Sequence, residues 1–379
     1  MRFSTLFLAL SILCLAFAGP SFADEADRIR AIEKQLEQQT ALIKKQAEQI
    51  ERLKTGTTSQ DGAAIDQAVE RYLRAKEDKG DLIKMSAGYD GGFFIEGGKD
   101  KSFRLNVNGW SINHFSAFEK NTGETSTWGP DENRLAFSGH VWRYHEFKLD
   151  MELLAAPVAR YVFYNMHYWD EAQIKIGQFK QPFGFNQLRA QRHQDFAARG
   201  LIAQLAPGYD LGAMVHGTVL DGYVNYALGF FNGGQLATNS GRNATDANSD
   251  KDVAGRIVLN PLIKSDNEYL KHMQMGFNWT WGVAQSTASA LSYSTSGGTT
   301  FFNTGGATFD NDKTRYRLGA HWAWRGGPAS LSFEWSRIDY GLVDVTGNAL
   351  TQADDLEVNA FNVEATWVLT GEEKGWKTV

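Results

Sequence analysis

The sequence predicts an all-β transmembrane protein, an antiparallel outer-membrane β-barrel with an N-terminal α-helical coiled-coil segment. From about Ser86 onward, apolar residues alternate with polar ones, which is the period of a strand with one apolar face. The chain also carries 38 glycines, and 13% of its residues are aromatic. Its mean hydropathy is −0.37, as expected where only alternate strand residues face lipid. No segment reaches the roughly 18 consecutive apolar residues that a membrane helix needs.

Residues 1–23 have the pattern of a secretory signal peptide. Arg2 precedes an apolar run from Leu6 to Ala18, and Ser21-Phe22-Ala23 forms a small-x-small cleavage site. The one cysteine, Cys14, lies inside this signal. The mature chain would therefore have no disulfide, no cysteine nucleophile and no cysteine metal site. We predict cleavage near Ala23 and localisation to the outer membrane of a Gram-negative bacterium.

Residues 24–54 have the pattern of a coiled coil. Apolar residues recur every seven positions, and the partner positions of the heptad carry two glutamines. The a positions are Ile29, Leu36, Ile43 and Ile50, and the d positions are Ile32, Gln39, Gln46 and Leu53. An isolated helix of this length has only marginal stability. We therefore expect it to be stable within an oligomer, a homotrimer in particular. The alternative is a single amphipathic helix.

Residues 55–85 read as a linker followed by a short helix. The stretch TGTTSQDG, residues 55–62, has the composition of a linker, and Ile65, Val69, Tyr72 and Leu73 then form one apolar stripe at helical spacing. The barrel is expected to occupy residues 86–379.

The predicted strands have one apolar face and one face that carries full charges. Phe147, Leu149 and Met151, for example, alternate with Lys148, Asp150 and Glu152. A soluble sandwich would also alternate, but repeated charges on the polar face suit a water-filled lumen with lipid outside. Basic residues expected on the lumenal face are Arg104, Arg134, Lys148, Lys175, Arg315 and Arg317. Turn-rich stretches, predicted to be extracellular loops, occupy residues 121–129, 233–250, 297–312 and 341–354.

The segment from Gln173 to Arg189 is predicted to be a strand that ends in a cationic loop. Alternation runs to Gly177, after which Pro182 removes a ladder donor and Gly184 permits a tight bend. The basic residues of this loop are Lys180, Arg189, Arg192 and Arg199. With Lys175 they outnumber the two acidic residues between positions 171 and 200, Glu171 and Asp195.

This segment resembles the phosphate- and polyphosphate-selective porin family of Gram-negative outer membranes, of porin O and P type. The resemblance is carried by GQFKQPFG at residues 177–184, by Leu188, by Ala206-Pro207-Gly208 and by GFFNG at residues 229–233. It implies a barrel of about 16 strands, in which this loop folds into the lumen and lines a constriction with cations.

The resemblance implies passive diffusion of small anions, most of all phosphate or polyphosphate. The expected pore-lining residues are Lys180, Arg189, Arg192, Arg199, Lys175, Arg104, Arg134 and Arg317. Lys180 is the leading candidate because it lies inside the motif. The expected partners are small anions, outer-membrane lipid and two further copies of the chain. We expect no cofactor, no metal and no nucleic acid.

Two departures from the family pattern leave alternatives open. Relatives commonly show Glu-Arg-Ser where this chain has Ala198-Arg199-Gly200, and an arginine after Pro-Gly where this chain has Tyr209. A general or other-anion porin with weak selectivity is therefore one alternative, and a structural barrel tethered by the coiled coil is another. An enzyme is disfavoured, because neither Gly-x-Ser-x-Gly nor His-Glu-x-x-His occurs.

The end of the sequence predicts an incomplete barrel. Alternation indicates about thirteen strands, whereas single-chain bacterial barrels close with an even number. The chain ends on Thr378-Val379, whereas the resemblance implies further strands and a terminal aromatic residue. We therefore expect residues 86–379 to be C-terminally truncated.

Overall fold

The chain divides into two compact units, Met1–Leu82 and Ile83–Val379. The computed structural model describes residues 67, 69, 71, 85–119, 125–154, 157–233, 249–283, 292–295, 299–303, 308–309, 314–344 and 354–373. In the first unit, Gln67, Val69 and Arg71 are helical, in the region where the sequence predicts a short helix. The predicted signal peptide and coiled coil lie outside the described residues. None of the described helices is long and apolar enough to cross a membrane.

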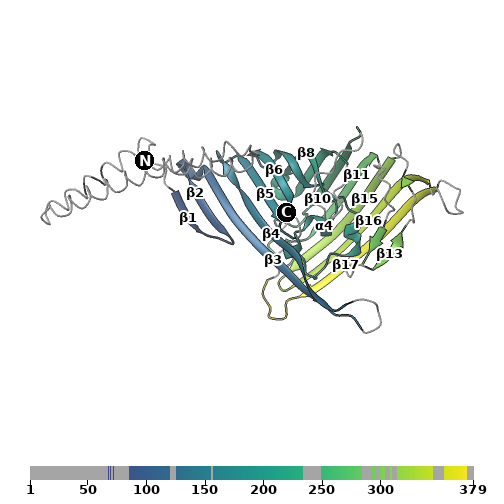
Figure 1. Ribbon diagram of the computed structural model, residues 1–379. Coiled ribbons are helices and arrows are strands. Elements are labelled where there is room, and N and C mark those ends of the chain that lie inside the picture. The colour runs from purple at the N-terminus through teal and green to yellow at the C-terminus, as the bar shows by residue number, and fades with distance from the viewer. Residues whose placement is uncertain are drawn as a thin grey trace, which may run out of the picture. The chain divides into compact units, whose positions relative to one another are not determined.

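The second unit is built on one large antiparallel sheet (Figure 1). Its successive strands are β1 Met85–Tyr89, β2 Phe93–Gly97, β3 Phe103–Ser116, β4 Thr127–Val141, β5 His145–Glu152, β6 Val158–Trp169, β7 Ala172–Lys180, β8 Tyr209–Val219, β9 Val224–Phe231, β10 Asp252–Leu259, β11 Gln274–Val283, β15 Thr314–Gly326, β16 Ala329–Asp344 and β17 Asp354–Trp367. Each of these strands pairs with the next one in this order.

Shorter elements complete the unit. They are the hairpin of β12 Ser292–Ser294 and β13 Thr300–Asn303, strand β14 Thr308–Phe309, helix α4 Phe185–Leu188, and the single-turn helices η1 Lys99–Lys101, η2 Gln191–His193, η3 Leu201–Gln204 and η4 Leu220–Gly222. β14 pairs with β16, so the main sheet holds fifteen of the described strands. Alternation of apolar and polar residues predicts about thirteen strands. A strand of two residues, such as β14, is too short to show alternation.

The sheet has two edges within the described residues. β1 pairs with β2, and β17 pairs with β16. No pairing joins β1 to β17 in the part of the chain that the structure describes. The predicted antiparallel strand order is therefore present, and the closed barrel remains a proposal.

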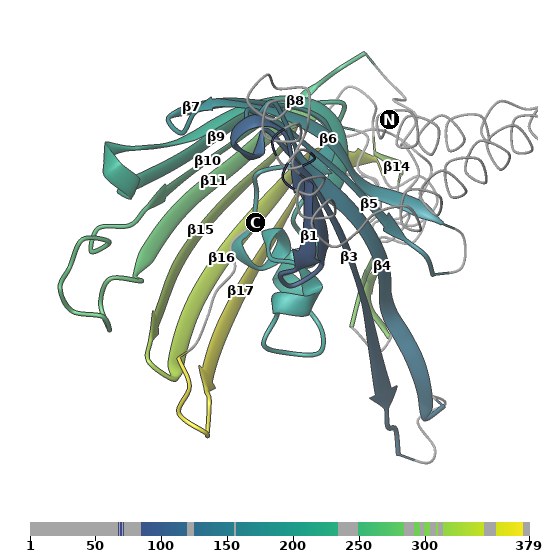
Figure 2. The same ribbon diagram turned by 90° about the vertical axis from the view of Figure 1, so that its left-hand side faces the viewer.

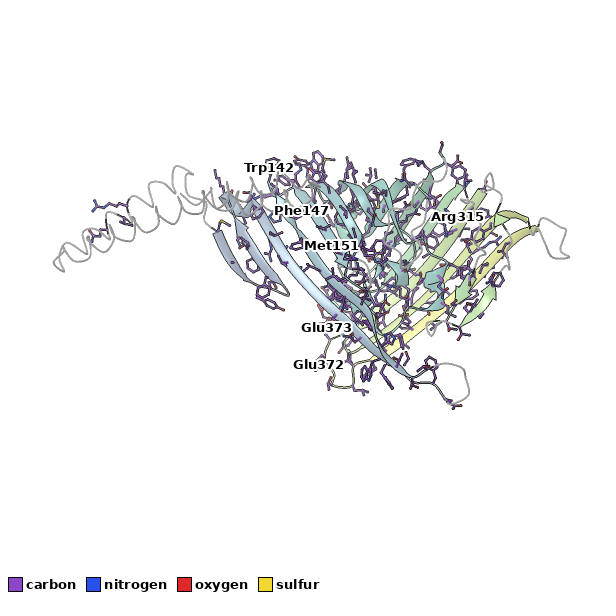
Figure 3. The ribbon with its side chains drawn as sticks, in the orientation of Figure 1. Trp142, Phe147, Met151, Arg315, Glu372 and Glu373 are labelled. Atoms are coloured by element: carbon purple, nitrogen blue, oxygen red, sulfur yellow. The ribbon has the colours of Figure 1, made fainter. Side chains whose placement is uncertain are left out.

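Polarity across the sheet is the reverse of that in a soluble protein. On β11, the apolar Phe277 and Trp281 are 47% and 54% exposed, while the intervening Asn278 and Thr280 are buried. On β5, Asp150 is buried beside Met151, which is labelled in Figure 3. Alternation thus places polar side chains on one buried face, here called the polar face. An apolar face open to its surroundings suits lipid and not water.

Successive connections lie alternately at the two ends of the sheet, because each antiparallel strand reverses direction. The end called the turn end has connections 98–102, 142–144, 170–171, 220–223, 260–273 and 327–328. The other end, called the loop end, has connections 90–92, 117–126, 153–157, 181–208, 232–251, 284–313 and 345–353. The stretches predicted to be extracellular loops all map to the loop end. Residues 181–208 are the segment that the sequence predicts to fold inward.

Candidate constriction site

Residues 181–208, here called the β7–β8 segment, cross the polar face of the sheet. The teal segment between β7 and β8 lies inside the curve of the strands in Figure 2. The segment leaves β7 at Lys180 and returns to β8 at Tyr209, which pairs with Lys180. Gly184 has a φ of 80°, a left-handed conformation in which a side chain would be strained. The glycine therefore sets the bend at which α4 begins.

Polar side chains of distant strands hold the start of this segment. The Gly184 N–H donates to Asn278 Oδ1 of β11 at 3.1 Å. The Phe185 and Asn186 N–H groups donate to the two carboxylate oxygens of Glu334 on β16, at 2.6 and 2.9 Å. Hydrogen bonds to a charged group contribute roughly 1.5–3 kcal/mol each. Glu334 therefore fixes α4 to a strand that lies 148 residues further along the chain.

Further contacts fix the middle and the end of the segment. Asn186 Nδ2 donates to Glu364 of β17 at 2.5 Å, and Phe185 stacks on His321 of β15 with ring centroids 4.9 Å apart. Arg317 of β15 donates from Nε to the carbonyl of Leu205 at 2.8 Å. The β7–β8 segment is thus attached to β11, β15, β16 and β17 at several points.

Three cavities lie around this segment on the polar face. The loop-side cavity has a volume of about 790 Å³ and is lined by the loop end of β3, including His114. The central cavity of about 230 Å³ is lined by Trp110, Tyr161 and Arg192. The turn-side cavity of about 440 Å³ extends to Thr218 at the turn end of β8. The β7–β8 segment therefore lies between a cavity near the loop end of the sheet and a cavity near its turn end.

Lys180 lines all three cavities. Its side chain is buried, at 6% exposure. The ammonium donates to the carbonyls of Gln187 and Arg189, at 2.5 and 3.5 Å. Sequence reasoning predicts that Lys180 faces a passing solute directly. In the structure this lysine also holds the chain of the β7–β8 segment, while its charge is shared among the three cavities.

Among the residues that the structure describes, cations outnumber carboxylates in each cavity. The loop-side cavity is lined by Arg134, Arg160, Lys180 and Arg199, with Asp131 and Glu132. The central cavity is lined by Arg134, Lys148, Lys180, Arg192 and Arg199, with Glu132 and Asp150. The turn-side cavity is lined by Lys148, Lys175, Lys180 and Arg256, and none of the carboxylates that the structure describes lines it. The excess of positive charge thus increases from the loop end to the turn end.

Carboxylates pair with three of the predicted pore-lining arginines. Arg134 contacts Asp150 at 2.9 Å, Glu152 at 3.3 Å and Glu132 at 3.5 Å. Arg104 contacts Glu96 at 3.4 Å and Asp90 at 3.7 Å, and it lines none of the three cavities. Arg189 contacts Asp195 at 3.5 Å and Glu364 at 3.7 Å. Their charges are largely compensated where they stand.

Four other predicted residues have no carboxylate within 4.0 Å among the described residues. The Lys175 ammonium lies 4.7 Å from the ring centre of Phe163. The Arg192 guanidinium lies 4.1 Å from that of Trp110. Arg199 donates to the carbonyl of Arg189 at 2.9 Å, and Lys180 donates to the carbonyls named above. The eighth predicted residue, Arg317, is 2% exposed and attaches the end of the β7–β8 segment.

Sequence reasoning missed Arg256 on β10. Arg256 lines the turn-side cavity, and its buried Nε has no hydrogen-bond partner among the described residues. The signal was available, because Ile257 and Leu259 alternate with it and are exposed on the apolar face. The anchoring carboxylates Glu334 and Glu364 were also missed, because no local pattern identifies the partner of a distant loop.

The family model for phosphate-selective porin O and P matches residues 103–378. The chain belongs to this family. A solved structure of OprB from Pseudomonas putida, determined at high pH, is similar over 70% of this chain and 75% of that chain, with 12% sequence identity and a TM-score of 0.40. No curated protein matches the chain. As a porin, the protein is an outer-membrane channel for small solutes and not an enzyme.

Proposed function

We propose that this porin is a passive channel for small anions, phosphate or polyphosphate first, and that the β7–β8 segment forms its constriction. The carrying observation is the excess of cations over carboxylates in all three cavities. A ring of lysines and arginines in a narrow pore attracts anions and replaces part of their hydration. The net charge of −6 for the whole chain does not oppose this, since the local charges set the field in the constriction.

The uncompensated cations are suited to phosphate in particular. Arg192 and Arg199 present planar guanidinium groups, whose N–H donors match two phosphate oxygens at once. Lys175 and Lys180 supply further point charges on β7. These four residues, predicted from the sequence, are our proposed pore-lining cations. Arg104, Arg134, Arg189 and Arg317 act in this proposal mainly through the ion pairs and loop contacts that they make.

A weakly selective anion porin is the second candidate, and one observation favours it. Three carboxylates surround Arg134, and Asp150 also lies 3.4 Å from the Lys148 ammonium. These acids reduce the positive field of the central cavity. The two candidates differ in the degree of selectivity and not in the sign of the preferred ion.

We further propose that the sheet closes as an outer-membrane barrel and that three copies assemble. Unpaired strand edges in lipid cost several kcal/mol per unsatisfied backbone group, so β1 and β17 need further partners. In this proposal residues 1–23 are removed near Ala23, residues 24–54 form a three-stranded coiled coil, and residues 55–85 link it to the barrel. A tethered structural barrel would share this organisation without conducting ions.

The test is electrical. The purified full chain is inserted into planar bilayers, and the reversal potential is measured in a potassium chloride gradient and again in a potassium phosphate gradient. We expect the potential to have the sign of an anion-selective pore in both salts. A reversal potential of cation-selective sign would refute the proposal, and the absence of any conductance by inserted protein would favour the structural tether.

A further inference from the structure

The lining of the turn-side cavity is both cationic and aromatic, and inorganic phosphate would bind only to its cations. Its lining includes Lys148, Lys175, Lys180 and Arg256, which are the groups expected for an anion. The rest of its lining includes the aromatic residues Tyr161, Phe163 and Phe179. A phosphate ion is hydrated on all sides and gains nothing from an aromatic wall. The aromatic residues therefore point to a ligand with an apolar part.

The cations and the aromatic rings of this cavity are interleaved. The Lys175 ammonium lies 4.7 Å from the Phe163 ring centre and 5.7 Å from that of Phe179. The Lys148 ammonium lies 4.1 Å from the Tyr161 ring centre. On the neighbouring strands β5, β6 and β7, an ammonium group thus lies over an aromatic ring at two places. A ligand that joins an anionic head to a flat body would contact both.

Two of the cations are available to an anionic head. Lys175 and Arg256 have no carboxylate within 4.0 Å among the described residues, and Arg256 Nε has no hydrogen-bond partner there. An arginine fork can bind two oxygens of a phosphate or carboxylate. The cavity volume of about 440 Å³ lies within the range of roughly 300–1,000 Å³ that is typical of small-molecule sites.

We propose that the turn-side cavity is a binding site for organic anions with an aromatic body, aryl phosphates in particular. The anionic head binds between Lys175 and Arg256, and the ring packs on Phe163 and Phe179. This inference rests on the proposed function as an anion channel, and it adds a class of solute that the channel selects over inorganic phosphate.

The test compares two probes that share a head group. Chloride current through the full-length porin in planar bilayers is titrated with phenyl phosphate and, separately, with inorganic phosphate. We expect half-block by phenyl phosphate at a concentration about tenfold lower, which corresponds to about 1.4 kcal/mol. Such a gain is the size expected for one aromatic contact. Equal half-blocking concentrations in the parent protein would overturn the inference.

Variants separate the head-group contact from the ring contact. Phe163→Leu, which keeps apolar bulk, should weaken block by phenyl phosphate and leave block by inorganic phosphate unchanged. Arg256→Gln should weaken block by both probes. Phe277→Ala on the apolar face of β11 is the matched control and should change neither. If Phe163→Leu changes nothing, the ring does not bind there and the inference fails.

The reversal potential of the same channels distinguishes the two proposals. Anion-selective channels that do not discriminate between the probes would retain the proposed function and refute this inference. Channels without anion selectivity would refute both. A preference for phenyl phosphate that disappears in Phe163→Leu would support this inference.

Discussion

Individual charges on the polar face act through their nearest partners. Arg134 and Lys180 both line the loop-side and central cavities. Carboxylates at 2.9 to 3.5 Å compensate Arg134, whereas Lys180 contacts backbone carbonyls, which carry no net charge. The lysine therefore contributes more to the field in the pore than the arginine does. The partner matters as much as the residue type.

Lys180→Glu is expected to reduce the anion preference sharply, and Lys180→Gln to reduce it by less. At an effective dielectric constant near 20, two unit charges about 4 Å apart interact by about 4 kcal/mol, and salt and pore water reduce this to about 1–2 kcal/mol. The measurement is the anion-to-cation permeability ratio from reversal potentials. Arg104→Gln, outside the three cavities, is the control. A Lys180→Glu porin with the selectivity of the parent would show that this charge does not face the permeation path.

Asp150→Asn is expected to increase the anion preference. Asp150 contacts Arg134 at 2.9 Å and Lys148 at 3.4 Å, and it lines the central cavity. Removing its charge leaves both cations less compensated, although Glu132 and Glu152 still contact Arg134. Glu96→Gln, which removes a carboxylate from Arg104, serves as the control because neither residue lines the cavities. Reversal potentials check the result, and an unchanged ratio in Asp150→Asn would contradict it.

At the scale of the elements, the strands were predictable and the attachment of the β7–β8 segment was not. Alternation is a local property, so residues such as Phe277 and Asn278 reveal the apolar and polar faces without knowledge of the fold. The bend at Pro182 and Gly184 is equally local. The partners of α4 depend on strand register across the whole sheet, and Glu334 lies 148 residues away. The same limit applies to the pairing of Arg134 with Asp150 and Glu152.

The β7–β8 segment is expected to loosen when Glu334 is replaced by Gln. A glutamine side chain offers one acceptor oxygen and turns an amide donor toward the second backbone N–H, so one hydrogen bond worth roughly 1.5–3 kcal/mol is lost. Trypsin should then cleave faster after Arg192 in the folded porin, and open-channel current noise should rise. The control is Glu357→Gln on β17, which removes an ion-pair partner of Arg337 on β16. Equal cleavage rates in the two variants would contradict the anchoring role.

At the scale of the whole molecule, the arrangement of polarity decides where the protein can reside. A sheet with exposed Phe277 and Trp281 and buried Asp150 and Asn278 is suited to a lipid surround and an aqueous interior. Alternation predicts this arrangement, because it recurs on strands such as β5, β10 and β11. The family assignment agrees with it. Closure and oligomeric state depend on contacts between distant edges and between copies, so local patterns only suggest them.

Deletion of residues 24–54 is expected to lower the temperature at which the proposed trimer dissociates and to leave single-channel conductance nearly unchanged. The heptad spacing of Ile29, Leu36, Ile43 and Ile50 favours association of helices, whereas the cavities lie in the second unit. Semi-native gel electrophoresis after heating checks the first expectation, and bilayer recordings check the second. A deletion variant with the heat resistance of the parent would assign the segment another role.

The increase in positive charge from the loop-side cavity to the turn-side cavity makes the permeation path electrically asymmetric. With identical salt on both sides, anions driven from one end meet the strongest attraction first, and anions driven from the other end meet it last. The channel should therefore rectify, passing unequal currents at opposite voltages of equal size. Neutralising Lys175 and Arg256 together would level this gradient and straighten the current–voltage curve. In the cell, such rectification would make the anion current depend on the sign of the Donnan potential across the outer membrane.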